Sequence, residues 1–418
     1  MDATLALFLP IFGGLLLAAG FLDDIAARTR LPGILLVLLL GLLIDNRLDA
    51  LNGQPAALIS LDHADQLSQI ALVLVLFFGG VTTNWQHMRP VLVPAGRLAS
   101  LGAGLTALLI MAVVMAISSL PLGPGAVTVP MALFIGAMLC STDASAVLSV
   151  LRPLAGRLPQ RLISLIECES AFNDPVAVVL CGLAMAMAVG HTDTSAAALV
   201  TEVTRQFLLG ALLGFLGGSI AAQTLGALTF KESRTQVVVL SLAFLALLVG
   251  VTQLLGGSGI LAAYVAGLVL GNNPRCEQAL LEEAHAGFAK MAELMLFLCL
   301  GLVVQPEQVV KALGWSLVLF AAMVLVRALT VEALLWRGGF ERPERLFISV
   351  AGLRGAVPIA MAIQAAAKGP ELSWGASMPP LALAVVLLGL LLQGFALTPI
   401  ARRLGLASPG SADMRGKE

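Results

Sequence analysis

The chain has 418 residues, of which 59% are hydrophobic and only 12% are charged, and its formal net charge is −1. A soluble domain carries roughly a quarter of its residues as Asp, Glu, Lys and Arg, so this composition excludes a soluble globule. The balanced charge, with no basic arm, also argues against a nucleic-acid partner.

Apolar runs long enough to cross a bilayer recur along the whole chain. A spanning helix needs about 20 apolar residues, because its backbone polar groups must bond internally in lipid. We therefore predict an all-α polytopic membrane protein of about 13 spans, the first of which lacks the basic flank of a signal peptide. The predicted spans are residues 3–22, 31–44, 66–83, 98–118, 127–150, 162–189, 205–229, 235–255, 257–271, 286–304, 308–336, 345–367 and 380–401.

The basic residues in the predicted loops orient these spans. With the N-terminus outside, 17 Lys and Arg residues fall in inside segments and only 3 in outside segments. The positive-inside rule then places the C-terminus in the cytoplasm and the protein in the cell membrane. Residues 1–404 form the predicted transmembrane domain, and residues 405–418 a short cytoplasmic tail.

Spans two and nine resemble each other, which predicts an inverted repeat. Residues 33–46 and 259–272 share six residues at a constant offset of 226. Because these spans are seven apart, they cross in opposite directions. Spans 1–6 and 8–13 are then inverted repeats, an arrangement that in transporters encloses the binding site.

Two corresponding spans have irregular interiors. Span 5 carries the polar run Ser141–Ser145, and span 12 carries Gly352-Leu353-Arg354-Gly355 followed by Pro358. Such residues weaken or break a helix, and broken helices at membrane depth are tolerated where they line a cavity. We predict two crossing broken helices; two kinked packing helices are the alternative.

Several ionisable residues lie at predicted membrane depth, where each costs about 2.5–3.5 kcal/mol even on the gentler scales. Lys290 and Glu293 are three apart on one helix and can pair. Glu169 is the candidate partner of Arg327, as a structural ion pair. Arg354 can offset nearby carboxylates or helix carbonyls.

Span 6 holds the candidate ion site. Ser170 and Asp174 share a helix face, and Glu167 lies two turns before Asp174 as an accessory candidate. Pro175 cannot donate to the carbonyl of Ala171, which leaves a free oxygen beside the carboxylate. A hard monovalent cation favours such carboxylate, hydroxyl and carbonyl oxygens. One buried Asp that holds either a proton or a cation couples two fluxes; a merely structural bridge from Asp174 to an arginine is the alternative.

The sequence contains no motif that indicates a cofactor site or an enzyme. The five cysteines form no CxxC pair, the four histidines fall in or beside predicted loops, and no HExxH motif or phosphate loop occurs. We expect no cofactor and no catalytic residues.

The residues above resemble the sodium–proton antiporter family, in its NhaP and eukaryotic exchanger branch, over essentially the whole chain. The matching motifs are Glu169-Ser170-x-x-Asn173-Asp174, Thr142-Asp143, Arg327-Ala328-Leu329 and Gly352-Leu353-Arg354-Gly355.

The resemblance implies a secondary active transporter that exchanges Na⁺ or K⁺ for H⁺, with Asp174 as the exchanged carboxylate. Asp143, Ser170 and the backbone at Thr142 would complete the ion shell. Asn173 would stand where electrogenic relatives carry a second Asp, which implies electroneutral one-for-one exchange. The family forms homodimers in which a core, here spans 4–6 and 11–13, moves like an elevator against the remaining spans.

Two departures limit the resemblance. Phe77-Phe78-Gly79-Gly80 lacks the acidic residue that many relatives carry before the glycine pair, and we expect no cytosolic regulatory domain after the last span. The motifs around Asp143 and Arg354 lean toward a potassium-handling subgroup. A cation channel or uniporter, and a sodium-coupled organic-anion symporter of similar architecture, are the rival functions.

Overall fold

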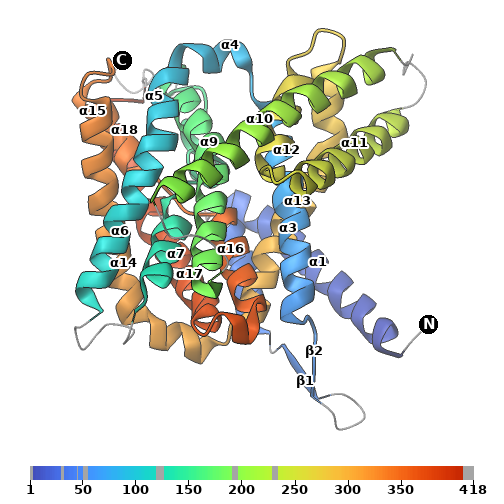
Figure 1. Ribbon diagram of the computed structural model, residues 1–418, viewed down its shortest axis with the longest axis vertical. Coiled ribbons are helices and arrows are strands. Elements are labelled where there is room, and N and C mark those ends of the chain that lie inside the picture. Colours follow the sequence, from blue (N-terminus) through green and yellow to red (C-terminus); the bar gives the residue numbers. More distant parts are fainter. Residues whose placement is uncertain are drawn as a thin grey trace, which may run out of the picture.

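The structure is a computed structural model that describes residues 3–29, 33–44, 46–49, 55–118, 127–190, 196–227 and 234–407. It is a bundle of helices with one short hairpin at its lower end, opposite α4 at the upper end (Figure 1). The predicted tail, apart from residues 405–407, lies outside the described residues.

The first half of the chain builds nine α-helices and the hairpin. These elements are α1 (Ala3–Thr29), α2 (Gly33–Leu43), β1 (Arg47–Asp49), β2 (Pro55–Ala57), α3 (Leu61–Thr82), α4 (Trp85–Met88), α5 (Leu92–Arg97), α6 (Ala103–Ile117), α7 (Val129–Cys140), α8 (Ala144–Val150) and α9 (Gln160–Val189). Short 3-10 turns at Arg89–Val91 and Arg152–Leu154 and a π-helical turn at Leu98–Gly102 join some of them.

The described residues of the second half form helices joined by short non-helical segments. Its elements are α10 (Ala196–Ala227), α11 (Arg234–Leu254), α12 (Gly259–Gly271), α13 (Gln278–Val303), α14 (Pro306–Leu335), α15 (Arg342–Val350), α16 (Ala356–Ala367), α17 (Met378–Leu388) and α18 (Gly394–Arg403), with 3-10 turns at Gly369–Glu371 and Gly375–Ser377 and a π-helical turn at Gly389–Gln393.

The all-α membrane class is confirmed, but the number of crossings is not. Each of the predicted spans coincides with a helix or with a pair of successive helices. By length and hydropathy, eight helical runs among the described residues are long enough to cross a membrane, or nine if the bent pair α7–α8 counts as one. The short apolar helices α2, α12 and α16 fall below that limit, so the count of thirteen stays a prediction.

Two local features differ from the sequence prediction. Residues 85–97, predicted as a loop, are largely helical, because Asn84 caps α4 through Gln86 and His87, and Pro90 and Pro94 are tolerated near helix starts. The hairpin β1–β2, which pairs Arg47 with Ala57, is also not predicted; its strands are too short to show an alternating pattern.

Both predicted breaks are present, and they touch each other. Helices α7 and α8 are bent by 44° about residues 141–143, and α15 and α16 are separated by residues 351–355. The backbone N–H of Asp143 donates to the carbonyl of Leu353 at 2.8 Å. The two broken helices therefore cross at their non-helical segments, where this bond pairs one backbone N–H with one carbonyl.

Glycine contacts support the inverted repeat. A Cβ on Gly41 in α2 would meet the backbone of Leu298 and Gly301 in α13. A Cβ on Gly267, the repeat equivalent of Gly41, would meet the backbone of Phe77 and Gly80 in α3. The pair α2–α13 thus repeats the contact of the pair α12–α3, as an internal two-fold relation requires.

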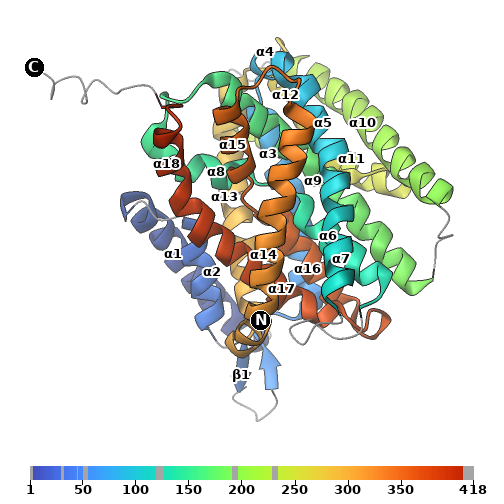
Figure 2. The same ribbon diagram turned by 90° about the vertical axis from the view of Figure 1, so that its left-hand side faces the viewer.

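Helix α9 lies between two groups of helices. In Figure 1, α11 and α12 lie on the right, while α6, α14, α15 and α18 lie on the left, with α9 between them. Figure 2 shows α14 running most of the height of the molecule beside α6. Hydrogen bonds join Asp174 to Ser141 and Asn173 to Thr142, so the middle of α9 lies against the first break.

Candidate ion-binding site

The non-helical segment after α7 carries three polar residues into the interior. Ser141, Thr142 and Asp143 follow the last turn of α7; Ser141 and Asp143 have extended backbone, and Asp143 caps the next helix. The carboxylate of Asp143 accepts from the backbone N–H of Ala146 at 3.1 Å and from the hydroxyl of Ser145 at 2.7 Å. Asp143 is thus the N-cap of α8, and its charge is stabilised there by backbone dipoles.

Asp174 on α9 faces this break. The hydroxyl of Ser141 donates to Oδ1 of Asp174 at 2.6 Å. Ser141 is not among the residues that the sequence predicts for the site, although it belongs to the polar run that marks the break. Because helical periodicity ends at Cys140, the direction of its side chain does not follow from spacing.

A second network joins the same two elements directly beside this bond. The side-chain amide of Asn173 donates to the hydroxyl of Thr142 at 2.8 Å, and its carbonyl accepts from the backbone N–H of Thr142 at 3.3 Å. The hydroxyls of Thr142 and Ser170 lie 3.0 Å apart. All three side chains are buried, so Asn173 fixes the position of the break against α9.

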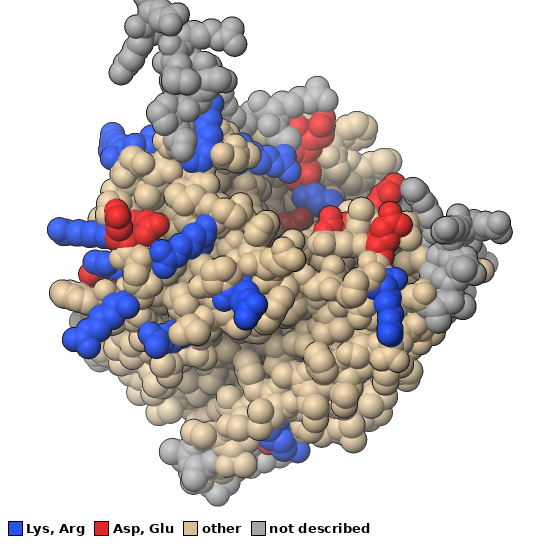
Figure 3. Space-filling view, turned by 90° about the horizontal axis from the view of Figure 1, so that it is seen from above, with Lys and Arg blue, Asp and Glu red and all other residues tan. Residues whose placement is uncertain are grey.

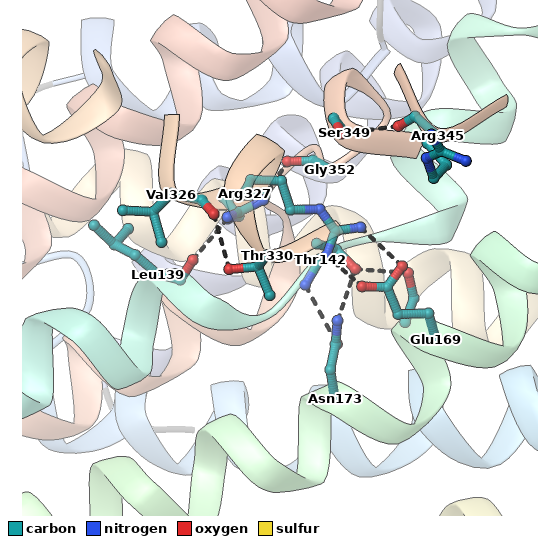
Figure 4. A network of polar contacts seen from close by, with 12 residues as sticks. Leu139, Thr142, Glu169, Asn173, Val326, Arg327, Thr330, Arg345, Ser349 and Gly352 are labelled. Atoms are coloured by element: carbon teal, nitrogen blue, oxygen red, sulfur yellow. Dashed lines mark hydrogen bonds and ion pairs between the residues drawn. The ribbon is translucent and has the colours of Figure 1, made fainter. Parts of the chain in front are cut away.

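Glu169 and Arg327 form a buried ion pair between α9 and α14 (Figure 4). Arg327 donates from Nη2 to Oε2 of Glu169 at 2.8 Å, and from Nη1 to Oε1 in the second bond of a bidentate pair. Only 1% of Glu169 and 6% of Arg327 is exposed. The pair joins the two helices, and neither member contacts Asp174 through a hydrogen bond or ion pair among the described residues.

Arg354 sits at the second break and points toward the end of α7. Its Nε donates to the carbonyl of Leu139 at 2.8 Å, and Nη1 donates to the carbonyl of Gly352. The last carbonyls of a helix have no partner within the helix and carry partial negative charge. Arg354 therefore offsets the C-terminal end of α7, one of the two roles expected for it.

A cavity of about 350 Å³ connects the acidic residues. Its lining comes from α3, α12 and α13 on one side and from the α7–α8 break and α9 on the other, and includes Asp143, Ser170 and Asp174. Glu167 lines the same cavity, nearer the start of α9. Figure 3 shows a hollow in the upper face with acidic and basic side chains gathered around it. A larger cavity, between the ends of α2 and α13, contains none of the predicted site residues.

The structure therefore brings most of the predicted site residues together around one break. Ser170, Thr142 and Asn173 are in contact, Asp174 is one helical position beyond Asn173, and Asp143 and Glu167 share the cavity with Asp174. Carboxylate, hydroxyl and backbone oxygens at this point match the preference of hard cations. Such a site can bind an alkali cation or a proton without thiol or imidazole ligands.

Comparison with known proteins gives consistent matches. The transmembrane model of the sodium/hydrogen exchanger family matches residues 13–403. The K(+)/H(+) antiporter NhaP of Alkalimonas amylolytica is 30% identical over 410 residues, which cover 96% of this chain and 67% of that protein. The K(+)/H(+) antiporter NhaP2 of Shewanella sp. (strain MR-4) is 32% identical over 417 residues, 96% of this chain and 68% of that protein. The solved sodium proton antiporter MjNhaP1 of Methanocaldococcus jannaschii at pH 8 superposes with a TM-score of 0.79 at 21% identity, over 96% of this chain and 100% of its own.

Proposed function

This chain belongs to the sodium/hydrogen exchanger family, and on that premise we propose that it exchanges potassium or sodium ions for protons across the cell membrane. The proposal names a secondary active transporter rather than an enzyme. The two relatives described above are K(+)/H(+) antiporters, which favours potassium as the cation.

The position of Asp174 is the observation that carries the proposal. Its carboxylate lies where α9 passes the α7–α8 break, it accepts from Ser141, and it lines the cavity. A carboxylate removed from water is destabilised when it is charged and unpaired, so it favours binding either a proton or a cation. Because both compete for the same oxygens, loading one releases the other.

The neighbouring oxygens supply the rest of the cation shell in this proposal. The hydroxyls of Ser170 and Thr142 lie 3.0 Å apart, and Asp143 lines the same cavity. Asn173 holds Thr142 through two hydrogen bonds, so it positions the shell without carrying charge. With one exchanged carboxylate, the expected stoichiometry is one cation for one proton, with no net charge moved.

The arrangement around the cavity suggests how the site gains access to the two sides. The cavity separates α3, α12 and α13 from the helices that carry Asp174 and Asp143. We propose that the core of spans 4–6 and 11–13 moves against the remaining spans in a homodimer. In this proposal the N-terminus lies outside. The face shown in Figure 3 is then cytoplasmic, as the loop charges predict.

Reconstitution tests this function directly. Purified protein in liposomes with an internal pH dye is given potassium, sodium, lithium or choline outside, with the membrane potential either clamped or left free. We expect cation-dependent pH changes that do not depend on the potential, and no response to choline. The Asp174→Asn variant should insert normally and exchange nothing, whereas Glu307→Gln, which alters an acid on α14 away from this cavity, should behave as the parent.

Either of two results would contradict the proposal. Cation-driven exchange at the parent rate in Asp174→Asn would remove Asp174 from the mechanism. A current that flows without proton coupling would favour a channel or uniporter instead.

A further inference from the structure

Lys290 on α13 is a basic residue that the exchange mechanism does not use. Its Nζ lies 3.1 Å from Oδ1 of Asp23 on α1 and 3.1 Å from Oε2 of Glu293, one turn further along α13. Lys290 and Glu293 both line the cavity that Asp174 lines, whereas Asp23 does not. The ammonium therefore stands at the wall of the cavity, held between an acid inside it and an acid outside it.

The charges around the cavity are unbalanced. Four carboxylates line it, and among the described lining residues Lys290 is the one basic side chain; the four are Asp143, Glu167, Asp174 and Glu293. Such a concentration of one sign raises the local concentration of cations. It also creates a problem of selectivity, because carboxylate oxygens are the ligands that calcium and magnesium prefer.

A fixed positive charge acts differently on monovalent and divalent cations. Its Coulomb energy with a bound cation is proportional to the charge of that cation, so a divalent ion is penalised twice as much as a monovalent ion. If a fixed charge weakens the affinity for a monovalent cation by a factor f, it weakens the affinity for a divalent cation by f squared. A single lysine can thus disfavour divalent ions more strongly than monovalent ions.

We propose that Lys290 is a specificity-determining residue, whose fixed ammonium charge keeps the cavity selective for monovalent over divalent cations. This inference rests on the proposed function, since it concerns the same cavity and the same cations. It assigns to Lys290 a role through charge rather than through contact with the transported ion.

A purely structural role for Lys290 makes a different prediction. The bond to Asp23 joins α13 to α1, so Lys290 could simply clamp the two helices. In that case Asp23→Asn would have the same effect as removing the lysine. If the charge matters, Asp23→Asn leaves the ammonium beside the cavity and should not raise cation affinity.

The test uses the reconstituted full chain and compares the parent with Lys290→Met. The apparent KM for potassium, and the inhibition constant of magnesium added on the same side, are measured at low ionic strength and again in high choline chloride. We expect KM to fall by about 3-fold and the magnesium inhibition constant by about 10-fold, the square of the first factor. Both differences should shrink in high salt, because the mobile ions screen the charge.

Matched variants complete the design. Lys290→Arg keeps the charge and should match the parent, and Lys311→Met removes a lysine that does not line the cavity and should change neither constant. Glu293→Gln removes one negative charge, so KM and the magnesium constant should both rise, the latter by the larger factor. This variant keeps the inference testable if Lys290→Met does not fold.

Two outcomes overturn the inference. One is a Lys290→Met protein whose magnesium inhibition equals that of the parent; the other is an Asp23→Asn protein that reproduces Lys290→Met. Failure of the proposed function would look different, because the parent itself would then exchange no cation for protons.

Discussion

The hydroxyl of Ser141 donates a 2.6 Å hydrogen bond to Oδ1 of Asp174, from the end of α7 across to the middle of α9. A hydroxyl donor stabilises the charged form of a carboxylate, which is the form that binds a cation. When a cation arrives, the same hydroxyl can turn its oxygen toward the ion. Ser141 therefore affects the competition between a proton and a cation for Asp174.

The Ser141→Ala variant should bind its cation more weakly. A hydrogen bond to a charged group contributes about 1.5–3 kcal/mol, so the apparent KM for the cation should rise by about 10-fold or more. Ser141→Thr, which keeps a hydroxyl, should recover much of the loss. The control is Ser149→Ala in α8, whose hydroxyl donates to the carbonyl of Ala146 instead. A KM equal to that of the parent in Ser141→Ala would show that the bond has no part in cation binding.

Ser141 also marks where sequence reasoning ends. Within a helix, the spacing of Ser170 and Asp174 predicts a shared face, and both line the cavity. Once the helix is interrupted, no period relates neighbouring residues, so the sequence locates the break but not the directions of its side chains. Asp143 is the exception: it caps α8, a role that its position before a helix could have suggested.

Long-range pairing was more predictable than local geometry. A buried charge needs a partner, and few charges lie at membrane depth, so Glu169 could be matched with Arg327 across 158 positions of sequence. By contrast, the hairpin β1–β2 and the helical start of residues 85–97 depend on short polar segments with weak patterns. The observed helix ends likewise differ from the predicted span ends by several residues. An apolar run can continue beyond the last residue of its helix or stop before it.

Breaking the pair of Glu169 and Arg327 should reduce stability more than cation affinity. Either Glu169→Ala or Arg327→Ala leaves an uncompensated buried charge, which costs about 3–5 kcal/mol. The double variant removes both charges and should be destabilised by less than the sum of the single changes. Thermal unfolding in detergent, with the KM of any remaining exchange, measures both properties.

The more exposed pair of Arg205 and Glu202, three residues apart on α10, provides the control for that experiment. Its removal should have little effect on the unfolding temperature, because ion pairs in contact with solvent are weak. Single variants of Glu169 and Arg327 that are as heat-stable as the parent would rule out a structural role for the pair.

A methyl group at Gly355 should disturb the crossing of the two broken helices. Gly355 precedes α16, and a Cβ there would overlap the carboxylate of Asp143. Overpacking of a filled site costs about 1–3 kcal/mol, so Gly355→Ala should lower both the unfolding temperature and the exchange rate.

Two comparisons isolate that effect. Gly182→Ala in α9 has open space around its Cβ and favours helix, so it should be tolerated. Combining Gly355→Ala with Asp143→Gly removes the three side-chain atoms that the new carbon would meet, and should recover part of the unfolding temperature but not the exchange. If Gly355→Ala exchanges normally by itself, the two breaks do not need their close approach.

The repeat makes a paired prediction about Gly41 and Gly267. Both residues occupy equivalent positions in α2 and α12, and a Cβ on either would collide with the backbone of the facing helix, α13 or α3. Backbone cannot move aside as a side chain can, so Gly41→Ala and Gly267→Ala should each separate their helix pair and destabilise the protein by similar amounts.

Gly104→Ala in α6, where nothing lies within 4 Å of the new carbon, should leave the unfolding temperature unchanged. Because α3 and α13 both line the cavity, the two repeat variants should also lower exchange to a similar degree. A large loss in one variant and none in the other would mean that the two halves share a fold but not the closeness of their packing.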